Sequence, residues 1–129
     1  MNIALLLRYM QFYAHMAHNL LGGETFFQDH TFLGDLYGAY EDEYDSVIER
    51  LIGSDKTVDL VKLHKSAADA LENPENYNDC FSELLSCEER LCEFIEKEAP
   101  KSSQGTMQLY GGIADASEMR QYKLKQRIK

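Results

Sequence analysis

The chain has 129 residues, of which 44% are hydrophobic and 27% are charged, and its formal net charge is −9. This length predicts a single domain with a sizeable core over residues 1–129. The absence of any run of about twenty apolar residues excludes a typical membrane span. The acidic balance disfavours general nucleic-acid binding, which needs a basic face.

Two helices are predicted in the first part of the chain. The first covers residues 2–21, and the apolar start MNIALLLRYM is interpreted as part of it. A signal peptide is disfavoured because this segment lacks a basic start and a small-residue cleavage site. Gly22-Gly23 ends the first helix, and the second runs from about Thr25, a candidate N-cap, to Ile52. The short link predicts that the two helices pack as an antiparallel hairpin.

The second predicted helix carries two neighbouring stripes of mainly apolar residues. They are Phe26, Leu33, Tyr40 and Val47, and beside them His30, Tyr37, Tyr44 and Leu51. Asp45 and Glu49 interrupt this face, although burying carboxylates is costly unless a partner or a metal compensates. Their spacing of four places both on one side of the helix, where they can chelate a cation such as iron or manganese. A plain solvated charged face is the alternative.

The second half of the sequence predicts two more helices after a long connection. Residues 54–77 form this connection, with a weak helical pattern from Val58 to Leu71. The third helix runs from about Asn78 to Lys97, and the fourth from about Thr106 to Arg127. Four long helices with one long middle connection predict an all-α fold, the ferritin-like four-helix bundle whose crossover contains a short helix.

The sequence predicts structural roles for the cysteines and for the basic C-terminal residues. Cys80 and Cys87 fall on the apolar stripe of the third helix and are predicted to be buried. The three cysteines include no C-x-x-C pair, which argues against a zinc site and fits a reducing, cytoplasmic location. The basic end RQYKLKQRIK, which includes Arg120, is interpreted as a solvated helix end that complements the helix dipole. Contact with phosphate is the alternative for this end.

Two histidines extend the set of candidate metal ligands. His18 precedes the Gly-Gly break by about one turn and His30 follows it by about two, so a hairpin can bring both to the same end. A core or surface histidine with a hydrogen-bond partner is the alternative, and it is the interpretation preferred for His15 and His64. His30 and Asp45 lie fifteen residues apart, roughly 22 Å along one helix, so one metal cannot bind both within one copy.

A two-fold arrangement of two copies removes this difficulty. If the second helices of two copies pack antiparallel, His30 of one copy lies beside Asp45 and Glu49 of the other. This arrangement gives two equivalent intersubunit sites. The other ferritin arrangement uses Glu-x-x-His pairs inside one bundle, and that motif is absent from this sequence. A di-iron centre within one copy is therefore disfavoured.

The segment from His18 to Ile52 resembles the signature of Dps-type miniferritins, the starvation-induced, DNA-protecting relatives of ferritin. The family pattern has a His at the end of the first helix and a second His twelve residues later, preceded by Phe-Phe. An Asp follows fifteen residues after the second His, and a Glu four residues further on. The matching residues here are His18, Phe26-Phe27, His30, Asp45 and Glu49. The resemblance implies that His18, His30, Asp45 and Glu49 are ferroxidase ligands across a dimer interface.

The resemblance also implies a function. An iron-binding miniferritin oxidises Fe(II) with peroxide or oxygen and stores Fe(III) in a hollow homo-oligomer, expected to be a dodecamer of two-fold dimers. This activity protects against oxidative damage, and zinc can replace iron in the purified protein. DNA binding is expected to be weak, because the lysine-rich N-terminal tail of many members is absent. The alternative is a structural or interaction protein with this fold and no efficient ferroxidase activity.

The sequence departs from the family pattern at two positions. The family often has an Asp four residues after the second His, where this chain has Gly34, with Asp35 next to it. This difference puts a second iron position in doubt. The family's Trp beside the first His is replaced by Asn19, and the chain has no Trp. The aromatic radical sink of the family would therefore have to be a tyrosine, such as Tyr37 or Tyr44.

Overall fold

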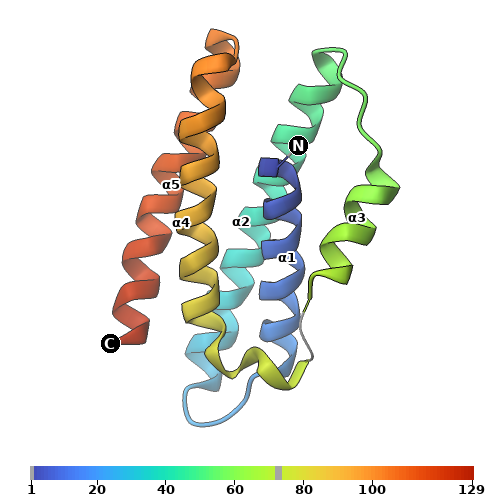
Figure 1. Ribbon diagram of the computed structural model, residues 1–129. Coiled ribbons are helices and arrows are strands. Elements are labelled where there is room, and N and C mark those ends of the chain that lie inside the picture. The colour runs from blue at the N-terminus through green and yellow to red at the C-terminus, as the bar shows by residue number, and fades with distance from the viewer. Residues whose placement is uncertain (1, 72–73) are drawn as a thin grey trace. The chain divides into compact units, whose positions relative to one another are not determined.

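The structure, a computed structural model, describes residues 2–71 and 74–129 and is helical, with no strand among these residues. The long helices are α1 (Asn2–Leu20), α2 (Phe26–Gly53), α4 (Cys80–Glu98) and α5 (Gln104–Ile128) (Figure 1). A shorter helix, α3 (Leu60–Asp69), lies in the long connection, followed by the 3-10 turn η1 (Pro74–Asp79). The predicted all-α class and the short crossover helix are confirmed.

The helices belong to two compact units. The first unit covers residues 3–80 and contains α1, α2 and α3, whereas the second covers residues 81–129 and contains most of α4 and all of α5. Each unit contains one pair of long helices, as the predicted helix order requires. The single four-helix bundle proposed from the sequence depends on how the two pairs combine, and it stays a prediction.

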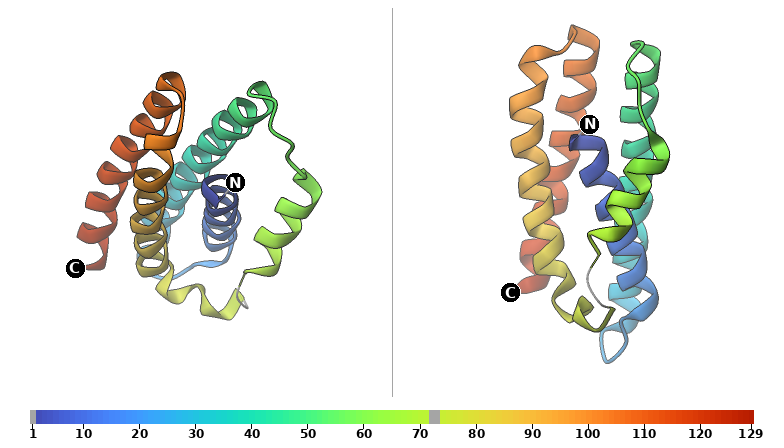
Figure 2. Two further views of the ribbon diagram at one scale, coloured as in Figure 1. Left: turned by 45° about the horizontal axis from the view of Figure 1, so that its top comes forward. Right: turned by 45° about the vertical axis from the view of Figure 1, so that its right-hand side comes forward.

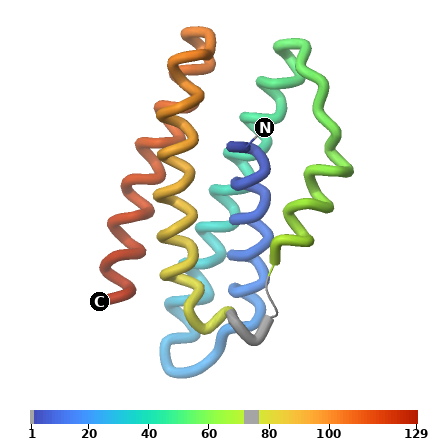
Figure 3. Tube along the Cα trace, viewed as in Figure 1, coloured from blue at the N-terminus to red at the C-terminus, as the bar shows by residue number. Residues whose placement is uncertain are grey.

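In the first unit, α1 and α2 form the predicted antiparallel hairpin, as Figures 1 and 2 show. The link between them is short (Figure 3). Gly23 in this link has a φ of +100°, a conformation that glycine adopts at low cost. The helices bury apolar residues at helical spacing, which is the main source of their stability in a protein. The fully buried residues are Ala4, Leu7, Met10, Ala14 and Ala17 of α1 and Leu33, Leu36, Tyr40 and Val47 of α2.

The start of α2 differs from the predicted cap. Thr25 occupies the N-cap position, but its side chain accepts no backbone hydrogen bond. Instead, Thr25 Oγ1 donates to Asp29 Oδ2 at 2.8 Å, and Asp29 is buried. The hydroxyl proton is thus used to satisfy a buried carboxylate, which would be costly to leave without a partner.

The helix α3 packs on both long helices of its unit. It begins at Asp59, whose side chain accepts a hydrogen bond from the backbone N–H of Lys62 at 3.0 Å, and it buries Leu63 and Ala67. The ring of His64 lies 6.1 Å from the ring of Phe12 on α1 and 5.9 Å from the ring of Tyr44 on α2. The long connection therefore covers part of the α1–α2 hairpin.

The second unit is an antiparallel pair, α4 and α5, joined by η2 (Ala99–Lys101) (Figure 2). Ser103 caps α5 by accepting a hydrogen bond from the backbone N–H of Thr106 at 3.3 Å. Gly111 and Gly112 do not interrupt α5. The buried apolar residues of these helices are Cys80, Phe81, Leu84, Cys87, Leu91, Ile95, Tyr110, Ile113 and Leu124.

Candidate metal-binding site

The structure brings His18 and His30 into direct contact across the α1–α2 hairpin. Their rings are stacked, with centroids 3.6 Å apart and planes inclined by 20°. His18 Nδ1 lies 2.7 Å from the backbone oxygen of His30, and His30 Nδ1 lies 2.9 Å from the backbone oxygen of His18. The sequence-based expectation that both histidines project from one end of the hairpin is confirmed.

These reciprocal hydrogen bonds determine that Nδ1 carries a proton in both rings. A carbonyl oxygen only accepts hydrogen bonds, so each Nδ1 must carry the proton. In a neutral ring, Nε2 then carries the lone pair and is the atom available to a metal. Histidines that bind metals usually donate their other ring N–H to a carbonyl or a carboxylate in this way. Each of the two histidines therefore has the Nδ1–H hydrogen bond that is typical of a metal ligand.

Gly34 creates the space that His18 occupies. A Cβ at this position would lie 3.3 Å from His18 Cε1 and 3.4 Å from His18 Nδ1, which is closer than most side chains pack. The residue that departs from the miniferritin pattern therefore lies directly beneath one of the proposed ligands. Its small size allows the ring of His18 to approach α2 and to stack on His30.

Aromatic rings surround the histidine pair. Phe26 stacks on His30 with centroids 4.9 Å apart, and the ring of Tyr37 lies edge-on to His18 at 5.2 Å. Tyr37 also stacks on His15 at 4.0 Å, with planes inclined by only 6°. Of the two tyrosines suggested as a radical sink, Tyr37 is the one beside the histidine pair. Tyr44 is buried and lies next to Arg8 instead.

The two carboxylates lie elsewhere on α2. Asp45 and Glu49 are both exposed, whereas Tyr44 and Ile48 beside them are buried. Within one copy the pair does not interrupt the buried face, contrary to the expectation from the sequence. Because α2 is one unbroken helix, His30 and Asp45 are separated by roughly 22 Å along its axis. Among the described residues of one copy, no group of three or more potential ligands is close enough to bind a metal.

The other residues discussed from the sequence have structural environments. His64 Nδ1 donates to the backbone oxygen of Leu60 at 2.7 Å, which is the role expected for this histidine. Cys80 and Cys87 are buried, as predicted. Burial raises the pKa of the Cys87 thiol to about 12, and the neighbouring carboxylate of Glu83 contributes. The Cys87 thiol is therefore disfavoured as a thiolate nucleophile near pH 7.

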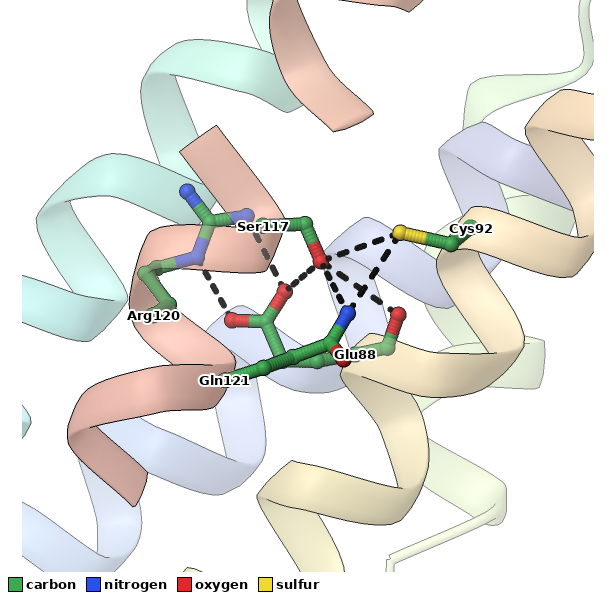
Figure 4. Close-up of polar contacts among 5 residues, drawn as sticks. All are labelled: Glu88, Cys92, Ser117, Arg120 and Gln121. Atoms are coloured by element: carbon green, nitrogen blue, oxygen red, sulfur yellow. Dashed lines mark hydrogen bonds and ion pairs between the residues drawn. The ribbon is translucent and has the colours of Figure 1, made fainter. Parts of the chain in front are cut away.

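A buried ion pair between α4 and α5 was not predicted from the sequence (Figure 4). Glu88 is 0% exposed and pairs with Arg120, whose Nη2 lies 3.1 Å from Glu88 Oε1. Ser117 Oγ donates to the same Oε1 at 2.8 Å. The interpretation of Arg120 as part of a solvated basic end is wrong, since this residue is 8% exposed. The signal for Glu88 was its spacing from Leu84 and Leu91, which places all three on one helix face.

Comparison with models of known families, with curated proteins and with solved structures finds no match for this chain. The resemblance to Dps-type miniferritins therefore rests on the motif between His18 and Ile52. Separately, none of the helices in residues 2–71 and 74–129 has the length and apolar character needed to cross a membrane.

Proposed function

We propose that this chain binds Fe(II) at sites shared between two copies and oxidises it there with peroxide or oxygen. As the miniferritin resemblance implies, the Fe(III) product would be stored inside a closed homo-oligomer. One observation supports this proposal above all others. The stacked rings of His18 and His30 each donate Nδ1–H to the other residue's backbone carbonyl, which leaves two Nε2 atoms for a metal.

The proposed ligands have complementary roles in this chemistry. Imidazole nitrogens suit Fe(II), and they also suit zinc, so zinc is the expected competitor. The carboxylates of Asp45 and Glu49 would come from the second copy. Both are exposed on α2 and therefore accessible to a partner. Carboxylate oxygens are hard donors that stabilise Fe(III) more than Fe(II), so this ligand set favours oxidation.

The length and direction of α2 support the two-fold arrangement. This helix runs unbroken from Phe26 to Gly53 and carries His30 near its start and Glu49 near its end. Two such helices packed antiparallel around a two-fold axis pair the start of one with the end of the other. The net charge of −9 would also attract cations to the acidic surfaces of the assembly.

The first test measures iron on the intact protein. Fe(II) is loaded without oxygen, peroxide is added, and the protein peak is analysed by gel filtration, light scattering and iron counting. The wild-type chain should form a large assembly that retains many irons per chain. The His18→Ala/His30→Ala and Asp45→Ala/Glu49→Ala variants should lose tight Fe(II) binding. Asp42→Ala is the matched control, because Asp42 is also an exposed carboxylate on α2.

A mixing experiment tests whether the two ligand pairs come from different copies. The double-histidine and double-carboxylate variants are unfolded, mixed in equal amounts and refolded together. Half of the random two-fold dimers then contain one copy of each variant, and each of these dimers has one intact site. About a quarter of the wild-type Fe(II) capacity should therefore return. A mixture as inactive as its components would contradict the shared site.

The second candidate is an assembly protein that keeps the fold without efficient oxidation. Gly34 favours it, because this position carries an Asp in many miniferritins and here supplies no ligand. A large assembly that retains no iron after loading would support this second candidate and overturn the first. A monomer without retained iron would overturn both.

A further inference from the structure

Arg8 is a buried cation that has no counter-charge among the residues that the structure describes. It lies on α1 and is only 9% exposed, and no carboxylate among the described residues forms an ion pair with it. Its guanidinium carbon lies 3.5 Å from the centroid of the Tyr44 ring, and this cation–π contact compensates part of the cost of burial. The exposed carboxylates of Glu41 and Asp45, which lie near Tyr44 in the sequence of α2, are not among its partners.

The hydrogen bonds of Arg8 are also incomplete. One amino group, Nη1, donates to Gln11 Oε1 at 3.3 Å. The Nε–H is shielded from solvent and has no acceptor in the part of the chain that the structure describes. Buried donors almost always have a partner, so this Nε–H is a position where an added acceptor would be favourable. Because the group is charged, the missing acceptor is best an anion.

Aromatic rings lie around the guanidinium group of Arg8. Phe12 lies beside the guanidinium at 5.6 Å, and the ring of His64 from α3 lies near both Phe12 and Tyr44. His64 donates Nδ1–H to the backbone oxygen of Leu60, so its Nε2 is left for another partner. Three elements of the first unit, α1, α2 and α3, thus contribute to this region.

We infer that Arg8 binds an oxyanion, a carboxylate or a phosphate, on the first unit. The guanidinium group presents Nε–H and Nη–H as a fork that matches two oxygens of such an anion. The guanidinium carbon lies 3.5 Å from the centroid of the Tyr44 ring, which restrains the position of this fork. The anion is either free in solution or a carboxylate of a second copy, and the chemistry is the same in both cases. This inference does not depend on the iron proposal and involves different residues from its ligand set.

The test combines the Nε–Hε resonance of Arg8, measured by two-dimensional ¹H–¹⁵N NMR, with the melting temperature. Inorganic phosphate is the probe, added at constant ionic strength with chloride as the balancing salt. For a free anion, the resonance should move saturably and the melting temperature should rise with phosphate. Arg8→Met should melt at the wild-type temperature or above it in chloride and show no rise with phosphate, because it lacks the uncompensated charge. Arg8→Lys keeps the charge without the fork and should respond more weakly.

Arg90→Met is the matched control, because Arg90 is exposed on α4 in the other unit and the variant should respond to phosphate as the wild type does. If a second copy supplies the carboxylate, phosphate should have no effect. In that case Arg8→Met, folded by circular dichroism, should fail to form the wild-type assembly in light scattering. The inference is overturned if phosphate moves neither the Arg8 resonance nor the melting temperature and Arg8→Met assembles normally. It is also overturned if Arg8→Met keeps the wild-type response to phosphate.

Discussion

At the scale of single residues, His18, His30 and His64 each donate Nδ1–H to a backbone oxygen, but the position of that oxygen in the chain differs. His64 donates its Nδ1 proton to Leu60, four residues earlier in the same helix, so its partner is fixed by local structure. His18 and His30 donate to each other's backbone carbonyls across the hairpin, so their partners exist only when α1 and α2 are paired. The availability of two Nε2 atoms at one place is therefore a result of the hairpin register.

Replacing Gly34 should test this dependence on a single side chain. In Gly34→Ala, the new Cβ would approach His18 Cε1 to 3.3 Å, so the ring must move and its hydrogen bond to His30 must weaken. We expect Fe(II) or Zn(II) affinity, measured by competition with a chelator, to fall by roughly ten-fold or more. Gly38→Ala is the control, because a Cβ there contacts nothing within 4 Å.

The control separates metal binding from helix stability. Gly38→Ala should raise the free energy of unfolding by about 0.5–1 kcal/mol and leave metal affinity unchanged. Equal metal affinity in the Gly34 and Gly38 variants would show that the position of the His18 ring does not limit binding.

At the scale of elements, the contacts within one helix pair differ in kind from the contacts within the other. Stacked and edge-on aromatic rings link α1 to α2, including the pairs His15–Tyr37 and His18–His30. A buried charge network links α4 to α5 through Glu88, Ser117 and Arg120. The charged and polar groups of this network can satisfy one another in only a few arrangements. The network therefore favours one register of α4 against α5. Apolar contacts of similar area tolerate small shifts more easily.

The ion pair provides a prediction about stability. Arg120→Met should lower the free energy of unfolding by about 3–5 kcal/mol, because Glu88 would remain buried without its counter-charge. The double variant Glu88→Met/Arg120→Met should recover most of this loss, since neither charge then remains. Urea unfolding followed by circular dichroism measures both values.

The exposed pair Glu89 and Arg90 on α4 supplies the matched controls. Single changes of these residues to Ala should alter the free energy of unfolding by less than about 0.5 kcal/mol. If the double variant were as unstable as Arg120→Met, packing of the two side chains would matter more than their charges.

At the scale of the whole molecule, the distribution of charge limits the choice of partners. The chain carries 22 acidic and 13 basic residues, and some of the basic ones are already engaged. Arg120 is paired with Glu88, and the guanidinium carbon of Arg127 lies 4.6 Å from the centroid of the Phe81 ring. The remaining exposed cations of the C-terminal segment are Lys123, Lys125 and Lys129. Three lysines on one helix end form a weak phosphate-binding surface in a chain of this net charge.

Duplex DNA should therefore bind poorly. At about 0.15 M salt we expect a dissociation constant no tighter than about 10⁻⁴ M, the weak end of non-specific binding. A gel-shift titration at several salt concentrations measures this constant. A retarded band at low micromolar protein that weakens steeply with added salt would contradict the expectation. The change of the three exposed lysines to Gln would then locate the contact.

The sequence by itself determined the helices, because the spacing of apolar residues and the turn residues between them are local properties. The long helices and the short helix near Val58–Leu71 were predicted close to their observed bounds. The sequence also identified His18 and His30 as neighbours, since a short link permits only one hairpin. These features follow from chain connectivity and from the burial of apolar side chains.

The tertiary structure decided which polar side chains are buried and what they contact. Glu88 and Arg120 lie 32 residues apart, and no local pattern reveals that they form a buried pair. Arg8 is buried against Tyr44 of another helix, a contact that no local sequence pattern predicts. Asp45 and Glu49 proved to be exposed, because the buried face of α2 passes beside them. Charge and hydrogen-bonding partners depend on contacts between distant segments, and the packing of the helices alone determines those contacts.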